Sequence, residues 1–510
     1  MSRILYIGDV TENTHDQVQK LAKHNRVPFR GLIESADIKL QATGYYFTSI
    51  IDLLPKDIVD IAGKFDEIRL IDTPQTEWSH SKIFLDSLDL IKKIKKQSNR
   101  IGTRVSYSKN TQTLEYWQEL FKTNNSLCIY PWITLNLDHG FGKKLTPCAR
   151  SKSIIHEDLN QVTDWQKDPS LVEIRSKFKK GHRMPDMCKT CYNYEDHGLT
   201  GYRVHDSLDW IANLGLKHID DLDKIDNPYF YNLRLSNKCN LMCRMCTPVH
   251  SHLLKQEFEE NPELEQPGQR LNQIYNNTTT SVVNIDSLTS KHLVYLTGGE
   301  PTIMKEVYEF MRNCIRNNRT DFGFSITTNA QNLNSTFMDL AQNFDNLHFS
   351  VSIDGCGIVN DYVRWGSNWD KLIENCHMLR ERGHIISWNH VPTIWGIHRT
   401  HELFEYISEH FPDVHLYLQY NRVDLHSAFR SPLIKQCVES MKRCQQTAVY
   451  WNNGKDCQSG VDSFLEHYES YSIDPIKLKE FFNWNDTMDR ARGIKLADYI
   501  PELDQCREVS

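Results

Sequence analysis

The sequence has 510 residues and a mass of 59.8 kDa, a length that suits about two to four domains of roughly 100–200 residues each. Its 59 Lys and Arg against 66 Asp and Glu give a net charge of −7 without a basic stripe, so the sequence does not predict an electrostatic nucleic-acid groove. No apolar run approaches the ~18–20 residues that cross a bilayer, and the N-terminus becomes polar too soon for a secretory signal. These features exclude membrane insertion and predict a cytoplasmic protein.

Residues 1–125 have the pattern of a small α/β domain. Short β-rich runs at Ile4–Ile7, Tyr45–Ile51 and Glu67–Ile71 predict strands, and a helix is expected over Lys56–Phe65. We therefore expect an α/β unit ahead of the rest of the chain.

Residues 126–205 stand apart because they hold a group of cysteines, and residues 206–228 are expected to form a linker after them. The group consists of Cys128, Cys148, Cys188 and Cys191. In a cytosolic chain such clustering favours metal ligation over disulfides. The last two form a C-x2-C pair, and four thiolates suit either a structural zinc ion or a fully ligated [4Fe–4S] cluster, which spacing alone does not separate.

Between residues 229 and 430 the chain alternates between β-rich and helical segments. Helical patterns occur at 305–317, 336–342, 369–382 and 400–410. This alternation predicts a parallel α/β sheet, either doubly wound or a partial (β/α)6 barrel, followed by a helical segment over residues 431–510. The six expected strands are Tyr231–Ser236, Leu293–Leu296, Phe322–Thr327, Leu347–Ile353, Ile385–Val391 and Val414–Gln419.

A C-x3-C-x2-C loop follows the first of these strands. Its cysteines, Cys239, Cys243 and Cys246, lie within eight residues and can converge on one iron–sulfur or zinc centre. A structural zinc site is closed by four ligands, so three would leave it incomplete, whereas a catalytic [4Fe–4S] cluster with three protein ligands keeps one iron free. On spacing alone, three buried or zinc-bound cysteines are the alternative.

A second motif ends the next expected strand. Gly298 and Gly299 allow close approach of the backbone to a ligand, Glu300 offers an acceptor to a cationic amine, and Pro301 suits a helix start. Ligands bind at the carboxyl ends of parallel strands. A GGEP turn alone is common. The specific feature is that the cysteine loop and the GGEP turn follow two successive expected strands, in this order.

Together the two motifs resemble the signature of the radical S-adenosylmethionine (radical SAM) superfamily over about residues 229–430. The resemblance implies that the three cysteines hold a [4Fe–4S] cluster and that SAM chelates its open iron. It assigns the methionine amine to Gly298, Gly299 and Glu300. The reduced cluster would cleave SAM to a 5′-deoxyadenosyl radical, which abstracts hydrogen from a substrate.

Smaller matches lie at later strand ends. Ser352, in an S-x-D-G segment, resembles the serine that contacts SAM in the peptide-modifying branch of the family, and Arg364 resembles the arginine that meets the SAM carboxylate. Asn329 matches the T-N of the third strand. Ordinary strand-end polarity is the alternative for these three residues. Met245 departs from the aromatic residue that often packs on adenine, although methionine is a soft apolar substitute.

The cysteine-rich segment over residues 126–205 resembles the twitch domain, a short relative of the SPASM auxiliary-cluster domain, placed here before the barrel. Four cysteines suit one auxiliary [4Fe–4S] cluster and not two. Some radical SAM enzymes also carry an N-terminal cobalamin domain, but His15 is the only match to its D-x-H-x-x-G motif.

The sequence therefore predicts a radical SAM oxidoreductase or transferase that acts on a peptide or protein side chain and draws electrons from a partner such as flavodoxin or ferredoxin. One alternative is the dehydrogenation or rearrangement of a small molecule such as an amino sugar or nucleotide. Another is a non-catalytic zinc or iron–sulfur binding protein on a degenerate barrel, against which the intact motif set argues.

Overall fold

The structure is a computed structural model, and its described residues fall into two compact units. Unit 1 comprises residues 1–133, 150–153 and 162–228, and unit 2 comprises residues 134–149, 154–161 and 229–510. The described residues are 3–8, 29–32, 44–49, 67–70, 104–106, 109–138, 144–151, 155, 164–196, 202–265, 283–412, 414–420, 426–452, 454–468 and 473–509.

Unit 1 begins with a five-stranded sheet in the order β2-β3-β1-β4-β5, in which every pair of neighbours is parallel. Its strands are β1 (Arg3–Gly8), β2 (Phe29–Leu32), β3 (Gly44–Ser49), β4 (Glu67–Leu70) and β5 (Arg104–Ser106). The three strands expected from the sequence correspond to β1, β3 and β4. The helix expected over residues 56–65 and the cobalamin-motif position, residue 15, lie outside the described residues.

The rest of unit 1 is helical. Its helices are α4 (Lys109–Thr123), α5 (Tyr130–Ile133), α6 (Pro169–Lys179), α7 (Pro185–Asp196) and α8 (Tyr202–Leu214). Helix α6 begins with Pro169 after Asp168, whose carboxylate caps the Leu171 amide at 2.9 Å. The buried Arg175 of α6 donates to the Pro131 carbonyl oxygen, and so joins α6 to α5.

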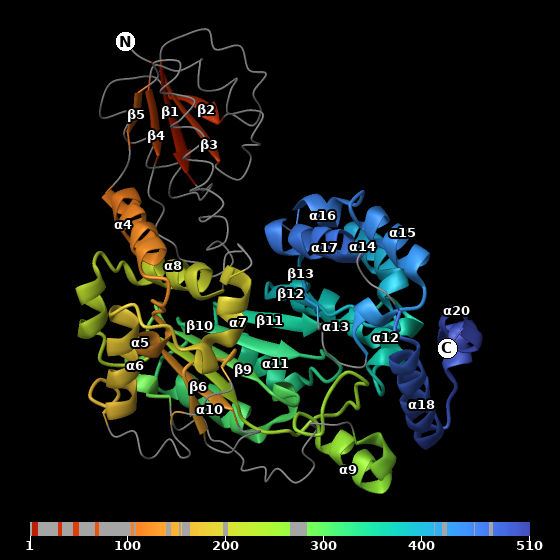
Figure 1. The fold of residues 1–510 in the computed structure, drawn as a ribbon. Coiled ribbons are helices and arrows are strands. Elements are labelled where there is room, and N and C mark those ends of the chain that lie inside the picture. Colours follow the sequence, from red (N-terminus) through yellow and green to blue (C-terminus); the bar gives the residue numbers. More distant parts are fainter. Residues whose placement is uncertain are drawn as a thin grey trace. The chain divides into compact units, whose positions relative to one another are not determined.

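Unit 2 is built on an eight-stranded sheet in the order β13-β12-β11-β10-β9-β8-β6-β7, and all of its neighbouring strands are parallel except β6 and β7. The six strands expected from the sequence are β8 (Phe230–Arg234), β9 (Leu293–Thr297), β10 (Gly323–Thr328), β11 (Leu347–Ser352), β12 (Ile385–His390) and β13 (His415–Leu418). They follow one another across the sheet in chain order (Figure 1). The predicted α/β class, with six parallel strands, is confirmed.

Two further strands extend this sheet beyond β8. They are β6 (Thr134–Asp138) and β7 (Lys144–Thr146), which come from the cysteine-rich segment. These two strands were not predicted from the sequence. Strand β6 pairs in parallel with β8 from Thr134–Phe230 to Asp138–Arg234, so it forms part of the same sheet as the strand that leads into the cysteine loop.

Helices connect and flank the strands of unit 2. They are α9 (His252–Glu260), α10 (Lys305–Arg316), α11 (Ser335–Ala341), α12 (Ile358–Val363), α13 (Trp369–Glu381), α14 (Thr400–His410), α15 (Ile434–Cys444), α16 (Ala448–Asn452), α17 (Gly454–Tyr468), α18 (Pro475–Arg492), α19 (Leu496–Tyr499) and α20 (Pro501–Asp504). Helix α10 shows why they form: Val307, Phe310, Met311 and Cys314 recur at helical spacing and are all buried. Among the described helices, none has the length and apolar character that a membrane crossing requires.

Candidate active site

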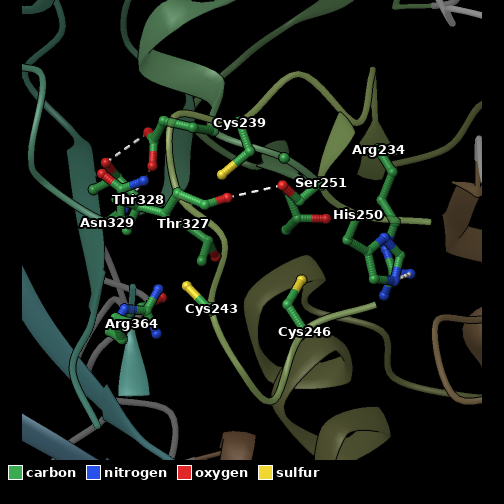
Figure 2. A pocket seen from close by; sticks show the side chains of 16 residues that line it. Arg234, Cys239, Cys243, Cys246, His250, Ser251, Thr327, Thr328, Asn329 and Arg364 are labelled. Atoms are coloured by element: carbon green, nitrogen blue, oxygen red, sulfur yellow. Dashed lines mark hydrogen bonds between the residues drawn. The ribbon is translucent and has the colours of Figure 1, made fainter. Parts of the chain in front are cut away.

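A cavity of about 200 Å³ lies where strands β8 to β11 end. Of the residues predicted for the three-cysteine site and its ligand, Cys239, Cys243, Cys246, Gly298, Gly299, Glu300, Asn329, Ser352 and Arg364 all line it. Figure 2 shows the three sulfur atoms around one open space, with Arg364 and Asn329 on the left of the view and Arg234 and His250 on the right. Met245 is not among the lining residues and packs instead with the apolar cluster that contains Cys239, Leu241 and Cys243.

The cysteine loop is held by backbone hydrogen bonds to the last residue of α12 and to the segment that follows it. The Met242 amide donates to the Trp365 carbonyl at 2.9 Å, and the Arg244 amide donates to the Val363 carbonyl at 2.8 Å. Ser251, the N-cap of α9, also donates its hydroxyl to the Leu241 carbonyl at 2.8 Å. The loop is therefore bound on both sides by secondary structure of unit 2.

The three thiols of the loop are desolvated. Burial raises the pKa of Cys246 to about 12 and also raises the pKa values of Cys239 and Cys243. Without a metal these side chains are neutral, and metal binding would release their protons. The guanidinium of Arg364 opposes the effect at Cys243, because a nearby cation favours the thiolate.

The glycine pair presses the end of β9 against the start of the cysteine loop. Gly298 and Gly299 have φ angles of +79° and +46°, which side chains rarely adopt. A Cβ on Gly299 would lie 2.3 Å from the carbonyl oxygen of Lys238, the residue before Cys239. The Glu300 amide donates to the same carbonyl at 2.8 Å, so this turn fixes where the loop begins.

Glu300 joins the ends of two strands through its buried carboxylate. Its Oε1 accepts from the amide and hydroxyl of Thr302, at 3.1 and 2.7 Å, and from the Thr328 hydroxyl at 2.7 Å. Its Oε2 accepts from the Asn329 amide at 2.6 Å. Burial raises the pKa of Glu300, while these hydrogen bonds favour the ionised form.

Two polar residues at the later strand ends have defined partners. Asn329 donates from Nδ2 to Oδ1 of Asn240, at 2.8 Å, and thereby links the end of β10 to the cysteine loop. Arg364 forms an ion pair with the buried Asp354, whose other oxygen accepts from the Val391 amide at 3.0 Å. Desolvation would lower the pKa of Arg364, but Cys243 and Asp354 outweigh it and raise that pKa.

The cavity also contains polar residues that the sequence analysis did not identify. These are Arg234, His250, Ser251, Thr297, Thr327 and Thr328. Arg234 and Thr297 end β8 and β9, and Thr327 and Thr328 end β10. The rule that ligands bind at the carboxyl ends of parallel strands would have identified these four.

The second cysteine set is divided between the two units. Cys128, Cys188 and Cys191 belong to unit 1, and Cys148 belongs to unit 2. Burial raises the pKa of Tyr192, and Cys188 and Cys128 add to this effect, so both thiols lie near that ring. Helix α7 departs from helical geometry at Cys188, where φ is −113° and ψ is 20°.

Within the described ranges, no three or more His, Cys, Asp or Glu side chains are arranged to hold a single metal ion as they stand. An iron–sulfur cluster binds its thiolates at separate irons, so its ligands stand farther apart than those of one ion. The three soft thiols that share the desolvated cavity fit a cluster in donor type.

Comparison with known proteins finds a family match in the middle of the chain. Residues 233–409 match the family model described as the radical SAM superfamily. Among curated proteins, none matches the sequence.

Solved structures that resemble this chain share little sequence identity with it. Streptococcus suis SuiB bound to S-adenosylmethionine is 17% identical over 55% of this chain and 60% of that chain, with a TM-score of 0.31. The anSMEcpe structure with bound AdoMet is 14% identical over 47% of this chain and 61% of that chain, also at 0.31. The methyltransferase TsrM from Kitasatospora setae, with cobalamin and a [4Fe–4S] cluster bound, is 10% identical over 87% of this chain and 79% of that chain, at 0.29. The matches thus span about three fifths of the length of the first two.

Proposed function

We propose that this chain, whose residues 233–409 match the radical SAM family model, is an enzyme that reductively cleaves S-adenosylmethionine and abstracts a hydrogen atom from its substrate. The observation that carries the proposal is that three thiols of one loop share a cavity with the GGE turn and with Asn329, Ser352 and Arg364. These residues follow four strand ends and, for Arg364, the end of helix α12, and they are far apart in the sequence. A common ligand accounts for their convergence.

The proposed cofactor is a [4Fe–4S] cluster held by Cys239, Cys243 and Cys246. When bound, it would supply the electron that breaks the C5′–S bond of SAM. The thiols would lose their protons as they become ligands, and Arg364 near Cys243 would favour the thiolate form. The glycine turn at Gly299 would keep the loop where the ligands meet.

The proposed binding of the methionine end uses charged groups whose positions are fixed by the protein. Asp354 orients the guanidinium of Arg364, which has five N–H donors in all and can reach a carboxylate with those that Asp354 does not take. Among the described residues, Oε2 of Glu300 accepts one hydrogen bond, so it keeps capacity for an ammonium group. Ser352 lines the cavity and adds a hydroxyl.

We further propose one auxiliary [4Fe–4S] cluster ligated by the cysteines of residues 126–205. Support comes from the order of Cys128, Cys148, Cys188 and Cys191 in the sequence and from the shared closeness of Cys128 and Cys188 to Tyr192. A fully ligated cluster has no open iron, so its role would be to accept an electron from the product radical or to relay one.

The proposed substrate is a peptide or protein side chain, and the S-x-D-G segment at Ser352 supports this proposal. The proposed electron donor is a flavodoxin or ferredoxin in the cytoplasm.

To test the substrate class, the reduced enzyme is given peptide and small-molecule fractions from cells grown in deuterated medium. Deuterium in 5′-deoxyadenosine with the peptide fraction supports the proposal. Deuterium with the small-molecule fraction alone would overturn it.

The reaction itself is tested by anaerobic reconstitution with iron and sulfide, reduction with dithionite, addition of SAM and measurement of 5′-deoxyadenosine. We expect turnover by the wild type and its loss in Cys243→Ser. The matched control is Cys314→Ser, which alters a buried cysteine of α10 outside the cavity and should retain turnover. No 5′-deoxyadenosine from the wild type, or equal amounts from Cys243→Ser, would contradict the proposal.

A further inference from the structure

Arg244 lies inside the cysteine loop, between Cys243 and Cys246, yet its side chain is fully buried on the C-terminal helix α18. Its Nη2 donates to Oδ1 of Asp489 at 2.5 Å, and its Nη1 donates to Oδ1 of Asn485 at 3.3 Å. The guanidinium also lies 3.7 Å from the ring centroid of Tyr362 and donates to the Tyr362 carbonyl at 2.9 Å. Arg244, which lies between two proposed ligands, is thus held in part by two residues of α18 that come more than 200 positions later in the chain.

A second contact from α18 reaches the other side of Cys243. Arg492 donates from Nη2 to the Met242 carbonyl at 2.9 Å, and its Nε and Nη2 each lie 2.7 Å from an oxygen of Glu257 on α9. Both side chains of this pair are at least 90% buried. The residues immediately before and after Cys243, Met242 and Arg244, therefore both form hydrogen bonds with side chains of α18.

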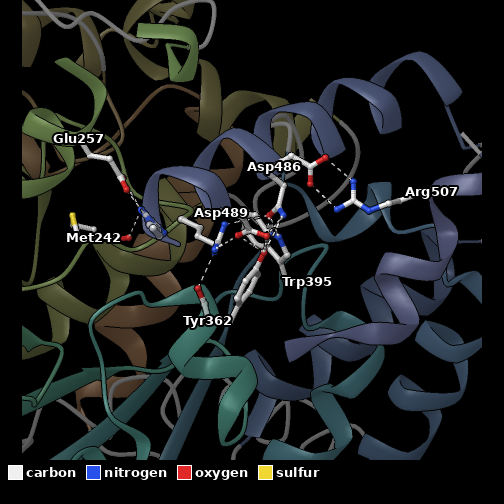
Figure 3. Close-up of polar contacts among 10 residues, drawn as sticks. Met242, Glu257, Tyr362, Trp395, Asp486, Asp489 and Arg507 are labelled. Carbon is white, nitrogen blue, oxygen red and sulfur yellow. Dashed lines mark hydrogen bonds and ion pairs between the residues drawn. The ribbon is translucent and has the colours of Figure 1, made fainter. Parts of the chain in front are cut away.

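The face of α18 that makes these contacts is continuous. Asn485, Asp489 and Arg492 follow at i, i+4 and i+7, a spacing that places them on one side of a helix. Asn485 accepts from Trp395 Nε1 at 2.8 Å, and Asp489 accepts from the Tyr362 hydroxyl at 2.9 Å, so the acceptors are themselves fixed (Figure 3). The helix ends one residue later at Gly493, with the left-handed C-cap that terminates many helices.

The charges of this network balance, because Arg244 and Arg492 are matched by Asp489 and Glu257. Replacing buried ion pairs by apolar residues is often neutral or stabilising, so their main value is not stability. Their directional hydrogen bonds instead define one arrangement of the chain around Cys243.

From these contacts we propose that α18 is a positioning element of the active site, which sets the placement of Cys243 and Cys246 through Asp489 and Arg492. This inference deepens the proposed function and rests on it for the identity of the bound cluster. The geometric part, that α18 determines the placement of the two thiols, is independent of any bound group.

The test uses full-length Asp489→Asn and, as a matched control, Asp486→Asn. Asp486 also lies on α18, but it pairs with Arg507 and has no contact with the loop among the described interactions. In anaerobic metal-free protein, mass spectrometry measures how fast iodoacetamide alkylates each cysteine, with Cys314 as the internal reference. The reduced, SAM-free cluster of each variant is then compared by electron paramagnetic resonance (EPR).

We expect Asp489→Asn to raise the alkylation rates of Cys243 and Cys246 about tenfold, since a buried charge that loses its partner opens the local structure. The EPR g-values should shift in the same variant, and Asp486→Asn should match the wild type in both measurements. Arg492→Gln should act in the same direction as Asp489→Asn, because it releases the Met242 carbonyl. Unchanged alkylation of Cys243 and Cys246 in a folded Asp489→Asn protein would overturn the inference, as would equal effects in Asp486→Asn.

Arg244→Lys provides the conservative comparison, because it keeps the charge but lacks the planar fork whose Nε, Nη1 and Nη2 donate to Tyr362, Asn485 and Asp489. It should alkylate at a rate between those of the wild type and Asp489→Asn. A rate equal to the wild type would exclude the guanidinium fork as the positioning contact. Failure of the wild type to cleave SAM would overturn the proposed function and would leave the alkylation result standing.

Discussion

A single glycine determines how closely two parts of the candidate site approach each other. Gly299 combines a positive φ with a backbone contact, and the contact is the more demanding of the two, because the Lys238 carbonyl occupies the place of a Cβ. Several other glycines in the described residues also have positive φ but face open space, among them Gly383 at +79°. The two kinds of constraint can therefore be separated by experiment.

We predict that Gly299→Ala lowers the iron content after reconstitution to less than half and destabilises the chain by about 1–3 kcal/mol, as overpacked sites do. The displaced Lys238 carbonyl would move Cys239 away from the other two thiols. Iron analysis and thermal unfolding measure both effects. Gly383→Ala imposes a similar backbone cost without the contact and should keep the wild-type iron content; equal iron loss in the two variants would show that backbone strain alone is responsible.

For individual residues, the sequence identified the candidate ligands but not the residues that hold them in place. The cysteine and glycine motifs predicted six residues that share the cavity, and the smaller matches predicted three more, because such motifs are local properties of the sequence. Arg244 occupies a variable position of the cysteine motif, and its partner Asp489 lies 245 residues away, so no local pattern indicates the contact. Two of the hydrogen bonds that Glu300 accepts, from Thr328 and Asn329, also depend on the alignment of β9 and β10.

The parallel sheet of unit 2 contains a polar row across its central strands. His348 on β11 is paired in register with Ser325 on β10, and its Nε2 lies 2.8 Å from the Ser387 hydroxyl of β12. The ring is also 3.3 Å from the Ser325 hydroxyl. Burial, together with the nearby His415, lowers the pKa of His348 to about 4, so the folded chain holds this imidazole neutral.

This arrangement predicts that unit 2 loses stability as the pH falls from about 6.5 to 4. In that window the unfolded His348 binds a proton that the folded His348 does not, which costs up to about 3 kcal/mol at the lower end. Urea unfolding of metal-free protein at several pH values measures the slope. His348→Gln should reduce it, whereas His410→Gln, at the partly exposed end of α14, should not. A slope that is unchanged in His348→Gln would rule out this histidine as its source.

Among the elements, those with local apolar patterns were predictable and those defined by distant pairing were not. The six strands β8 to β13 differ from their expected limits by at most two residues at either end, because buried parallel strands consist of short apolar runs. Strands β6 and β7 were missed since their place in the sheet depends on β8, which begins about 90 residues later. Helix α18 was expected to be helical and polar, but its buried polar face could be assigned only from the structure.

For the whole chain, the two cysteine sets have different proposed tasks, and this difference can be tested. We predict that Cys188→Ala lowers the bound iron by about four atoms per chain, one cluster, while SAM cleavage to 5′-deoxyadenosine continues. Cys506→Ala, which removes a thiol outside both sets, should change neither quantity. Unchanged iron in Cys188→Ala would show that this cysteine holds no cluster, and bound zinc in its place would indicate a structural site.

We propose that three cysteines leave one iron of a cluster open and that SAM binds there. This proposal is tested most directly by the EPR spectrum of the reduced Cys188→Ala protein, recorded with and without SAM, since this variant should contain the three-cysteine cluster alone. We predict a [4Fe–4S]⁺ signal whose g-values change when SAM is added. A signal that SAM leaves unchanged, or one that persists when Cys239, Cys243 and Cys246 are all replaced by Ala, would contradict it.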